Sequence, residues 1–221
     1  MARWEPNARG RLEQAALELY RERGFDTTTV KEIAQRAGLT ERTFFRHFAD
    51  KREVLFPHGN PLGENLVAAL GAVPETAPPL DAVVSALRKA SGLFEERREL
   101  VRHRQAVISA HAELQERELA KLASLSASLT EALTARGVPR TTAVLAAETG
   151  MAVFKVAFTR WLDAHEEPGQ RAQQDRRDLP DQRDQPDQAD QPDQPGQRAQ
   201  PDLADLVQET LDELKALAAQ D

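Results

Sequence analysis

The sequence predicts an all-α protein in which a small N-terminal helical domain precedes a larger C-terminal one. Nowhere in the 221 residues do apolar and polar residues alternate over the length of a strand. Apolar residues instead recur at helical spacing, and Thr, Asp and Gly stand where helices would begin and end. We therefore expect four regions: an N-terminal domain over 1–56, a helical domain over 57–164, a low-complexity stretch over 165–202 and a terminal helix over 203–221.

The N-terminal domain is expected to open with a helix from Asn7 to Arg23. Its apolar residues follow the spacing of one buried face, and they are Leu12, Ala15, Ala16, Leu19 and Tyr20. A shorter helix should begin at the capping box that Thr29 forms with Glu32. Gly38, which tolerates a positive φ, should end that helix.

Thr40 can cap the helix that comes next. A helix, a turn of about four residues with Gly and a second helix make a helix-turn-helix unit. The second helix of such a unit normally lies in the major groove of DNA. Asp50 and Glu53 form another capping box, which predicts a third helix beginning at Asp50.

Phe44 and Phe48 lie four residues apart and give the second helix of this unit an inward face. The outward and groove-facing sides are then left to Thr40, Glu41, Arg42, Thr43, Phe45, Arg46 and His47. Helix N-termini offer free N–H groups to phosphate, so the helix starts near Thr29 and Asp50 are candidate clamps on a DNA backbone. Lys51 adds a positive charge beside the second of them.

The motif TTV-x-x-IA-x-x-AG-L-T-x-x-TFFRHF-x-DK-x-x-L closely resembles the DNA-binding domain of TetR-family transcriptional regulators. The preceding RLEQAALELYRERGF is similar to the first helix of that family, so the resemblance covers roughly residues 7–56. A helical subdomain without DNA binding is the alternative for this region. The resemblance further implies a C-terminal helical domain that dimerises and binds a ligand.

The resemblance also implies roles for individual residues. Arg42 falls where the family reads bases, with Arg46 as a second contributor. Phe45 falls where the family usually has Tyr; without a hydroxyl it can offer only apolar contact, to a sugar or a thymine methyl group. Phosphate contacts are implied for Thr28 or Thr29, Thr40, Thr43, His47 and Lys51.

The distribution of charge is compatible with DNA binding although the net charge is −7. Residues 1–58 carry 11 basic and 9 acidic side chains, a balance of +2, whereas residues 165–221 carry 6 and 15, a balance of −9. The absence of cysteine suits a reducing cytoplasm, and the N-terminal residues lack the apolar core of a secretory signal. The most apolar helix, near 143–162, contains Glu148 and Lys155, and we expect it not to span a membrane.

The C-terminal domain should be helical from one end to the other. A short helix over 63–72 is expected after the break that Pro57, Gly59 and Pro61 make in the helical pattern. A loop over 74–79 should follow it. The stretch 80–135 should be helical with breaks near Glu95 and His111, and a long helix should run over 140–164.

Residues 165–202 hold ten Gln and six Pro but little apolar surface, which predicts a disordered linker. Asp202 can cap a final helix. That helix carries one apolar stripe, formed by Leu203, Leu206, Val207, Thr210, Leu211, Leu214 and Leu217. The linker is therefore an insertion rather than a tail, although it could also dock on the core and become ordered.

The helix over 140–164 is apolar on more than one side, so both sides need cover. We expect one side to pair with a second copy of the chain, together with the stripe of 203–217, as in the four-helix bundle of TetR-family dimers. A monomer that wraps this helix completely is the alternative. A symmetric dimer would place two recognition helices about one DNA turn apart, which suits a palindromic site.

A pocket for a small-molecule effector is expected among the middle helices. Arg104 or His111 would orient the effector, between walls drawn from Phe94, Met151, Phe154, Phe158 and Trp161. Alternatively, these aromatic residues are plain core. Arg104 would then be a surface side chain or the ion-pair partner of one carboxylate among Glu113, Glu116 and Glu148.

The sequence lacks the common catalytic motifs and histidines at metal-ligand spacing, so we expect neither enzymatic activity nor a metal or cofactor. These features predict a TetR-like DNA-binding regulator in the cytoplasm. It should bind a palindromic double-stranded operator as a homodimer and leave it when a small-molecule effector binds. The alternative is a helical adaptor that binds other proteins and has no sequence-specific contact with DNA.

Overall fold

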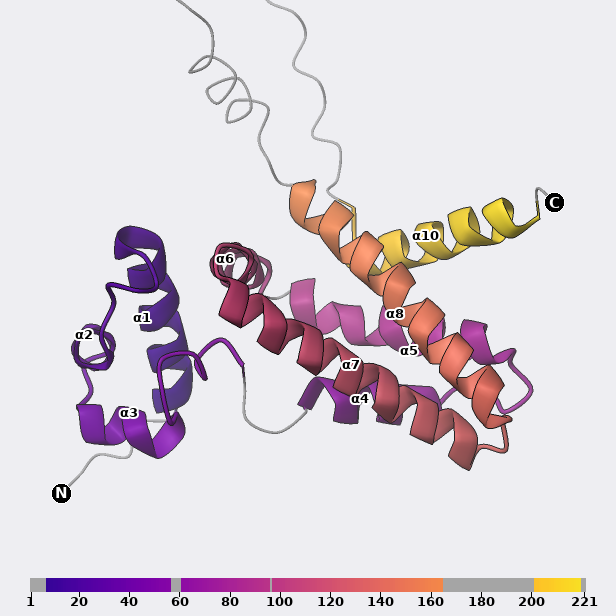
Figure 1. Cartoon of the computed structure of the whole chain (residues 1–221), viewed down its shortest axis with the longest axis horizontal. Coiled ribbons are helices and arrows are strands. Elements are labelled where there is room, and N and C mark those ends of the chain that lie inside the picture. Colours follow the sequence, from indigo (N-terminus) through magenta and orange to yellow (C-terminus); the bar gives the residue numbers. More distant parts are fainter. Residues whose placement is uncertain (1–6, 57–60, 96, 165–200, 220–221) are drawn as a thin grey trace, which may run out of the picture.

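The structure is a computed structural model that describes residues 7–56, 61–95, 97–164 and 201–219, and within these ranges it contains helices and no strands (Figure 1). The helices are α1 (Ala8–Arg23), α2 (Val30–Arg36), α3 (Glu41–His47), α4 (Pro61–Gly71), α5 (Pro79–Glu95), α6 (Arg98–Ser109), α7 (Ala112–Ala135), α8 (Arg140–Asp163) and α10 (Leu203–Ala218). The all-α prediction is confirmed. The predicted disordered linker lies outside the described residues, apart from its last two positions.

The first three helices form the N-terminal domain around a shared apolar core (Figure 1). The Asn7 side chain accepts a hydrogen bond from Gly10 N and begins α1. The largest core side chains are completely buried, and they come from all three helices: Leu12, Leu19, Ile33, Phe44 and Phe48. Ile108 of α6 and Leu114 of α7 belong to the same core, so the domain is continuous with the C-terminal helices.

The helix predicted to begin at Asp50 does not form. Residues 51–55 make only a turn, in which Leu55 N and Phe56 N each donate to the carbonyl three residues earlier, at 3.0 and 3.1 Å. The capping carboxylates are nevertheless used. Asp50 accepts hydrogen bonds from the N–H groups of Arg52 and Glu53, and Glu53 accepts from Ala49 N. Pro57 directly follows Phe56, and proline has no N–H group with which to continue a helix.

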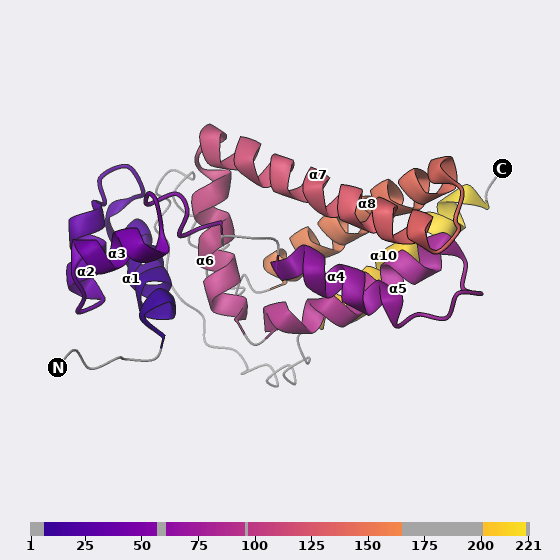
Figure 2. The same ribbon diagram turned by 90° about the horizontal axis from the view of Figure 1, so that it is seen from below.

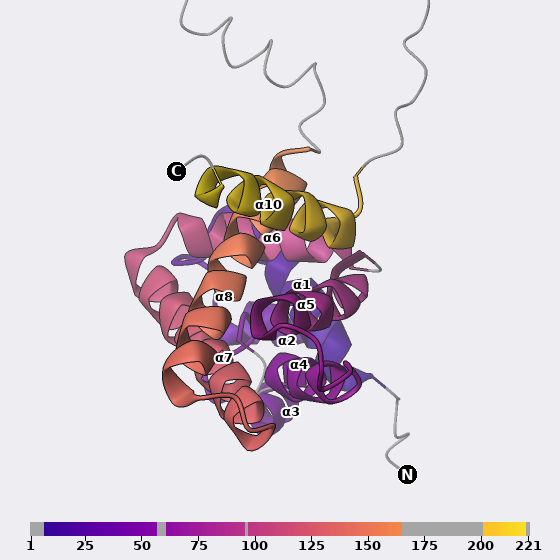
Figure 3. The ribbon, with the colours of Figure 1, turned by 90° about the vertical axis from the view of Figure 1, so that its right-hand side faces the viewer.

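The C-terminal domain packs α4, α5, α7 and α8 side by side, and α10 lies across α5 and α8 (Figure 3). Helix α6 stands between this bundle and the N-terminal domain, where it contacts α1, α5 and α7 (Figure 2). The breaks predicted near Glu95 and His111 are the two ends of the α6 segment. Any displacement of α6 or α7 must therefore act on the N-terminal domain.

Helices α5 and α8 approach each other closely at Gly150. A Cβ atom added at this position would clash with Cγ1 of Val83 in α5. Only glycine allows the two helices to reach this separation without a shift of the valine. Large apolar residues fill the rest of the interface, and Met151, Phe154 and Trp161 of α8 are all buried.

The carboxylate of Glu95, at the end of α5, fastens the start of α10. It accepts hydrogen bonds from Trp161 Nε1 of α8 at 2.7 Å and from the backbone N–H of Leu203 at 2.9 Å. Arg98 of α6 forms an ion pair with it at 2.9 Å and lies 4.7 Å from the centroid of the Trp161 ring. The Asp202 side chain caps α10 as predicted.

Within helix α8, one 18-residue window has a mean hydropathy of 1.3, so the helix is long and apolar enough to cross a membrane by these measures alone. The argument that Glu148 and Lys155 interrupt it is therefore not sufficient. Its packing distinguishes it from a membrane span more clearly, because α5, α7 and α10 all cover it. We interpret α8 as the central helix of the C-terminal domain.

Candidate nucleic-acid interface and effector cavity

Local hydrogen bonds hold α2 and α3 in a helix-turn-helix arrangement. Thr29 accepts from Glu32 N at 3.3 Å while the Glu32 carboxylate accepts from Thr29 N at 2.9 Å, so the predicted capping box is present. These bonds lower the pKa of Glu32 below its ordinary value. Gly38 turns the chain with a φ of 66°, and Thr40 caps α3 by accepting from Thr43 N at 3.2 Å.

Helix α3 buries one face and leaves the other open. Phe44 and Phe48 are buried as predicted, and Arg42 and Arg46 are exposed on the opposite side. Phe45 is 55% exposed, which is unusual for a phenylalanine. The open face therefore offers two guanidinium groups and an aromatic ring. Guanidinium groups can donate bidentate hydrogen bonds to guanine, and an aromatic ring can contact thymine methyl groups.

The four threonines that the resemblance associates with phosphate differ in availability. Thr28 is buried, and its hydroxyl donates to the carbonyl of Gly24 at 2.8 Å. Thr29 is exposed at the start of α2, although its hydroxyl also donates to Glu32 at 2.8 Å. The hydroxyls of Thr40 and Thr43 lie 3.0 Å apart at the start of α3. Of the pair Thr28 or Thr29, only Thr29 is exposed.

Lys51 is expected to contact phosphate, but its ammonium is occupied within the protein. Its Nζ donates to the backbone carbonyls of Phe25 at 2.8 Å, Asp26 at 3.0 Å and Thr28 at 3.1 Å. An ammonium has only three donors. Asp50 and Glu53 likewise accept from the N–H groups of Ala49, Arg52 and Glu53, so these three donors of the turn are used within the protein. Both features hold the domain together instead.

His47 ends α3 with a buried ring nitrogen, Nε2, that has no hydrogen-bond partner among the described residues. Burial lowers the pKa of His47 below its ordinary value, and the nearby Arg46 and Arg9 lower it further. A neutral imidazole can still donate one hydrogen bond. His47 is therefore a group in this region whose bonding capacity remains unused.

Side chains of α6 and α7 contact the turn that follows Asp50. Arg104 of α6 donates from Nε to the carbonyl of Leu55 at 2.7 Å. The guanidinium groups of Arg104 and Arg117 lie 5.2 and 4.9 Å from the centroid of the Phe56 ring. His111, at the start of α7, meets the Phe25 ring edge-on at 5.0 Å. The N-terminal domain is thus held by polar and aromatic contacts as well as by the shared apolar core.

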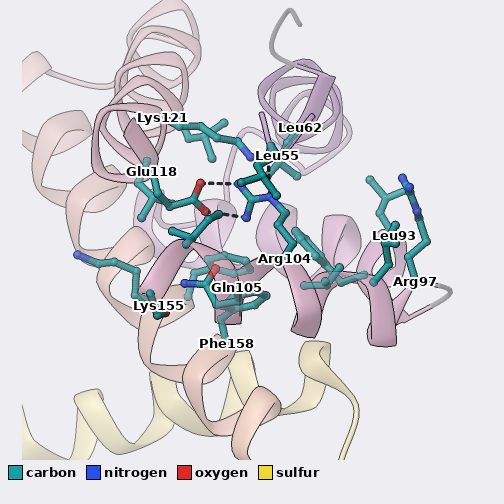
Figure 4. Close-up of a pocket in the computed structure, with 18 of the residues that line it drawn as sticks. Leu55, Leu62, Leu93, Arg97, Arg104, Gln105, Glu118, Lys121, Lys155 and Phe158 are labelled. Carbon is teal, nitrogen blue, oxygen red and sulfur yellow. Dashed lines mark hydrogen bonds and ion pairs between the residues drawn. The ribbon is translucent and has the colours of Figure 1, made fainter. Parts of the chain in front are cut away.

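A cavity of about 750 Å³ lies where α4, α5, α6, α7 and α8 converge beside the N-terminal domain (Figure 4). Four of the predicted pocket residues line it: Phe94, Arg104, Phe154 and Phe158. The other three do not. Met151 and Trp161 are buried in the bundle core, and the Nδ1 of His111 lies 2.8 Å from the carbonyl of Val107 near the N-terminal domain.

The acidic partner of Arg104 is one that the sequence analysis did not consider. Glu118 of α7 accepts from both terminal nitrogens of Arg104, at 3.2 and 2.6 Å (Figure 4). Burial opposes ionisation of Glu118, but the Arg104 guanidinium outweighs it and holds the pKa of Glu118 below its ordinary value. The sequence carries no signal for this pair, because 14 residues and a helix break separate its members.

The cavity also brings together residues that the sequence analysis did not single out. Lys121 and Gln105 line it, together with apolar side chains of α4, α6 and α7. Leu17 of α1 and the turn residues Val54 and Leu55 form part of the same wall. A molecule in the cavity would therefore touch the N-terminal domain directly.

Comparison with known proteins identifies the family of the N-terminal domain. Residues 13–56 match the family described as bacterial regulatory proteins, tetR family. Over 84 residues the chain is 40% identical to the HTH-type transcriptional regulator TcmR of Streptomyces glaucescens, a match that covers 38% of this chain and 37% of TcmR. Over 100 residues it is 31% identical to the HTH-type transcriptional repressor KstR2 of Mycolicibacterium smegmatis, covering 45% and 46%. The matches span less than half of each relative.

Solved structures extend the comparison to the whole fold. A transcriptional regulator from Aquifex aeolicus aligns over 96% of this chain and 99% of its own, with a TM-score of 0.54 and 13% identity. The fatty acid degradation regulator FadR from Bacillus halodurans aligns over 96% of both chains, with a TM-score of 0.53 and 14% identity. At these identities the likeness concerns the fold alone. Together with the match of residues 13–56, these comparisons support one conclusion: the N-terminal domain of this chain is that of the tetR family of bacterial regulatory proteins.

Proposed function

We propose that this protein is a repressor that binds a palindromic operator as a homodimer and is released by a small molecule. The observation that carries the proposal is the open face of α3, on which Arg42, Phe45 and Arg46 are exposed by a helix-turn-helix unit with both caps in place. In this proposal Arg42 reads bases, with Arg46 beside it. Thr29, Thr40, Thr43 and His47 meet phosphates, whereas Thr28 and Lys51 support the turn from within.

The proposed dimer uses the sides of α8 and α10 that the chain leaves open. Leu145 and Val156 of α8 are 62% and 51% exposed, and Leu217 of α10 is 67% exposed. Exposed apolar residues on two neighbouring helices suit a contact with a second copy. The twofold axis of such a dimer would present two α3 helices to the half-sites of a palindrome.

The proposed effector site is the cavity beside α6. Its volume of about 750 Å³ lies within the range of small-molecule sites, roughly 300–1,000 Å³. Its wall includes residues of the N-terminal domain, so a ligand can favour one placement of that domain over another. The ligand shifts the balance only by its different affinity for the two placements. A DNA-binding regulator with this role works in the cytoplasm.

The proposal is tested by selecting bound duplexes from a random pool with the full-length protein. We expect a palindromic consensus with half-sites about one helical turn apart, and an affinity that falls steeply as salt increases. A helical adaptor without sequence-specific contacts would enrich no consensus. Selection that returns no common sequence at low salt would therefore rule out the proposed function.

A further inference from the structure

The cavity beside α6 is basic, although the chain as a whole is acidic. Its described lining residues include four basic side chains, Arg97, Arg104, Lys121 and Lys155, and two acidic ones, Glu13 and Glu118. The formal charge of the lining is therefore +2, in a chain whose net charge is −7. Most of the remaining wall is apolar, with leucine and phenylalanine side chains contributed by α4, α5, α6, α7 and α8.

Both carboxylates of the cavity already have partners. Glu118 accepts two hydrogen bonds from Arg104, and Glu13 pairs with Arg9 at 3.0 Å and with Arg97 at 3.2 Å. Lys121, by contrast, makes no hydrogen bond or ion pair with any residue that the structure describes. Lys121 is half-buried, and its side chain lies beside the Arg104–Glu118 pair (Figure 4). Burial lowers the pKa of Lys121 and the positive charge of Arg104 adds to this effect, while the negative charge of Glu118 opposes it.

A second polar group in the cavity also lacks a partner. The Oε1 atom of Gln105 is buried and accepts no hydrogen bond within the described part of the chain. Because an unpaired buried polar atom is costly, such atoms commonly mark the place of a ligand or a bound water. Lys121 and Gln105, both residues of the cavity wall, thus leave a charged donor and a buried acceptor unused.

We propose that the effector is an amphipathic anion whose charged group binds Lys121 and whose apolar body lies against the leucine and phenylalanine side chains. This inference rests on the proposed effector role of the cavity. An anionic group at Lys121 would also lie beside the Arg104–Glu118 pair. It would repel the Glu118 carboxylate and compete with it for the Arg104 guanidinium.

Arg104 then connects the ligand to the DNA-binding domain. Its Nε donates to the carbonyl of Leu55, and its guanidinium lies against the Phe56 ring. Both contacts with the turn after Asp50 therefore depend on the position of this side chain. A guanidinium that moves toward the ligand weakens the contacts with Leu55 and Phe56. The expected result is a change in the placement of α3 relative to the C-terminal domain, and a lower affinity for the operator.

Two fluorescent probes with the same apolar body separate charge from hydrophobicity. The probe 1-anilinonaphthalene-8-sulfonate carries an anionic sulfonate, and N-phenyl-1-naphthylamine is the same ring system without it. We expect the full-length protein to bind the anionic probe at least tenfold more tightly. Lys121→Met should remove most of this preference, and Lys121→Arg should retain it. Lys89→Met removes an exposed lysine that is not part of the cavity wall, and should change nothing.

Displacement of the anionic probe identifies the class of the natural ligand. Decanoate and decyl phosphate, below their micelle concentrations, should displace it, and the ratio of their affinities distinguishes a carboxylate from a phosphate source. Decanol and decylammonium should displace it at least tenfold less well. Equal binding of the two fluorescent probes, unchanged affinity in Lys121→Met, or equal displacement by decylammonium would each overturn the inference.

Operator binding is measured separately with the same variants. A protein that prefers the anionic probe but selects no operator would refute the proposed function and leave the chemistry of the cavity standing. A protein that selects an operator but shows no preference for the anion would refute only the present inference. For the link through Arg104, displacing anions should weaken operator binding by the wild-type protein and leave Lys121→Met unaffected. Release that is equal in both would refute the link.

Discussion

Lys51 donates a hydrogen bond from Nζ to the carbonyl of Phe25 at 2.8 Å, and the same ammonium lies 4.6 Å from the centroid of the Phe25 ring. This residue occupies a position where the TetR resemblance implies a phosphate contact. Its bonds instead tie the turn after α3 to the turn before α2. Tyr20 completes the connection by donating to the carbonyl of Lys51 at 2.7 Å. A charge that sequence comparison would assign to DNA thus serves the internal structure of the domain.

Lys51→Met should therefore lower the free energy of unfolding, by about 1–3 kcal/mol, because three backbone carbonyls, two of them in the buried residues Phe25 and Thr28, lose their donor. Operator affinity should follow the loss of folded protein, and the dependence of affinity on salt should keep its slope. Denaturant unfolding and binding titrations at several salt concentrations measure both quantities. Lys31→Met, on the exposed side of α2, is the control for stability. A stable variant whose salt slope falls by about one would instead establish a phosphate contact.

Arg42→Ala should weaken binding to the best operator by about 1–3 kcal/mol and relax the preference at one base pair of each half-site. The reason is that Arg42 is exposed on the open face of α3 and makes no hydrogen bond or ion pair with any residue that the structure describes. Quantitative binding to a set of single-base operator variants measures the preference. The same measurement on Arg46→Ala tests whether the second guanidinium also contributes to base preference. An unchanged ranking of operator variants in Arg42→Ala would remove it from base recognition.

A double substitution, Leu145→Glu with Val156→Glu, should convert the proposed dimer into a folded monomer. Both side chains lie on the exposed side of α8, so the charges interrupt a contact between copies rather than the core. Sedimentation gives the mass, and circular dichroism verifies that the helices remain. Val67→Glu places the same charge on α4, where we expect no effect on assembly. A doubly substituted protein that still sediments as a dimer would show that the interface lies elsewhere.

Two glycines in neighbouring helices should respond to alanine with opposite signs. In Gly150→Ala the new methyl group would meet Val83, so we expect a loss of about 1–3 kcal/mol in the free energy of unfolding. In Gly92→Ala the methyl group meets no atom within 4 Å, and replacing a helical glycine should stabilise the protein by about 0.5–1 kcal/mol. Denaturant unfolding of the two variants tests the close approach of α5 and α8. Equal effects would mean that the helices are not in contact at Gly150.

Stability should fall between pH 6.5 and pH 5.5 because of two histidines. Burial holds the pKa of His47 and of His103 below the ordinary value of 6.5, with help from neighbouring arginines. The unfolded chain therefore takes up protons at a higher pH than the folded one, and the stability present above pH 6.5 is lost as pH falls through the lower folded values. The carboxylates with lowered pKa, such as Glu32 and Glu118, lose their contribution only at lower pH, below their ordinary 4.5.

Denaturant unfolding at the two pH values measures this effect. A protein with both His47→Gln and His103→Gln should show a smaller difference in the free energy of unfolding between pH 6.5 and pH 5.5 than the wild type. An identical difference in the two proteins would assign the pH dependence to other groups.

The sequence was sufficient for most of the helices because their ends are encoded locally. The caps at Thr29, Thr40 and Asp202 act within three residues, and the apolar spacing of each helix lies within its own segment. The error at Asp50 has the same local origin. Its cap is present, but a cap satisfies only the first N–H groups and cannot supply the packing that would extend one turn into a helix.

The candidate site was less predictable because its chemistry depends on distant partners. Residue type and spacing indicated Arg42 and the aromatic walls at Phe94, Phe154 and Phe158. They could not indicate that Lys51 reaches back 26 residues to Phe25, or that Glu118 rather than an expected carboxylate meets Arg104. Lys121 shows the same limit, since nothing in the surrounding sequence distinguishes an ammonium without a partner from one on a solvated helix.

The carboxylate of Glu95 has a practical consequence for engineering. It holds Trp161, near the end of α8, and the first residue of α10, so the two helices that flank residues 165–200 in the sequence are joined through one side chain. Foreign sequence introduced between those helices does not have to carry α10 to its position, because the position is already secured, and lengthening a closed loop adds little entropy cost. A fluorescent protein could therefore be inserted within 165–200 to report on the regulator, with both the helix-turn-helix and the termini left unmodified.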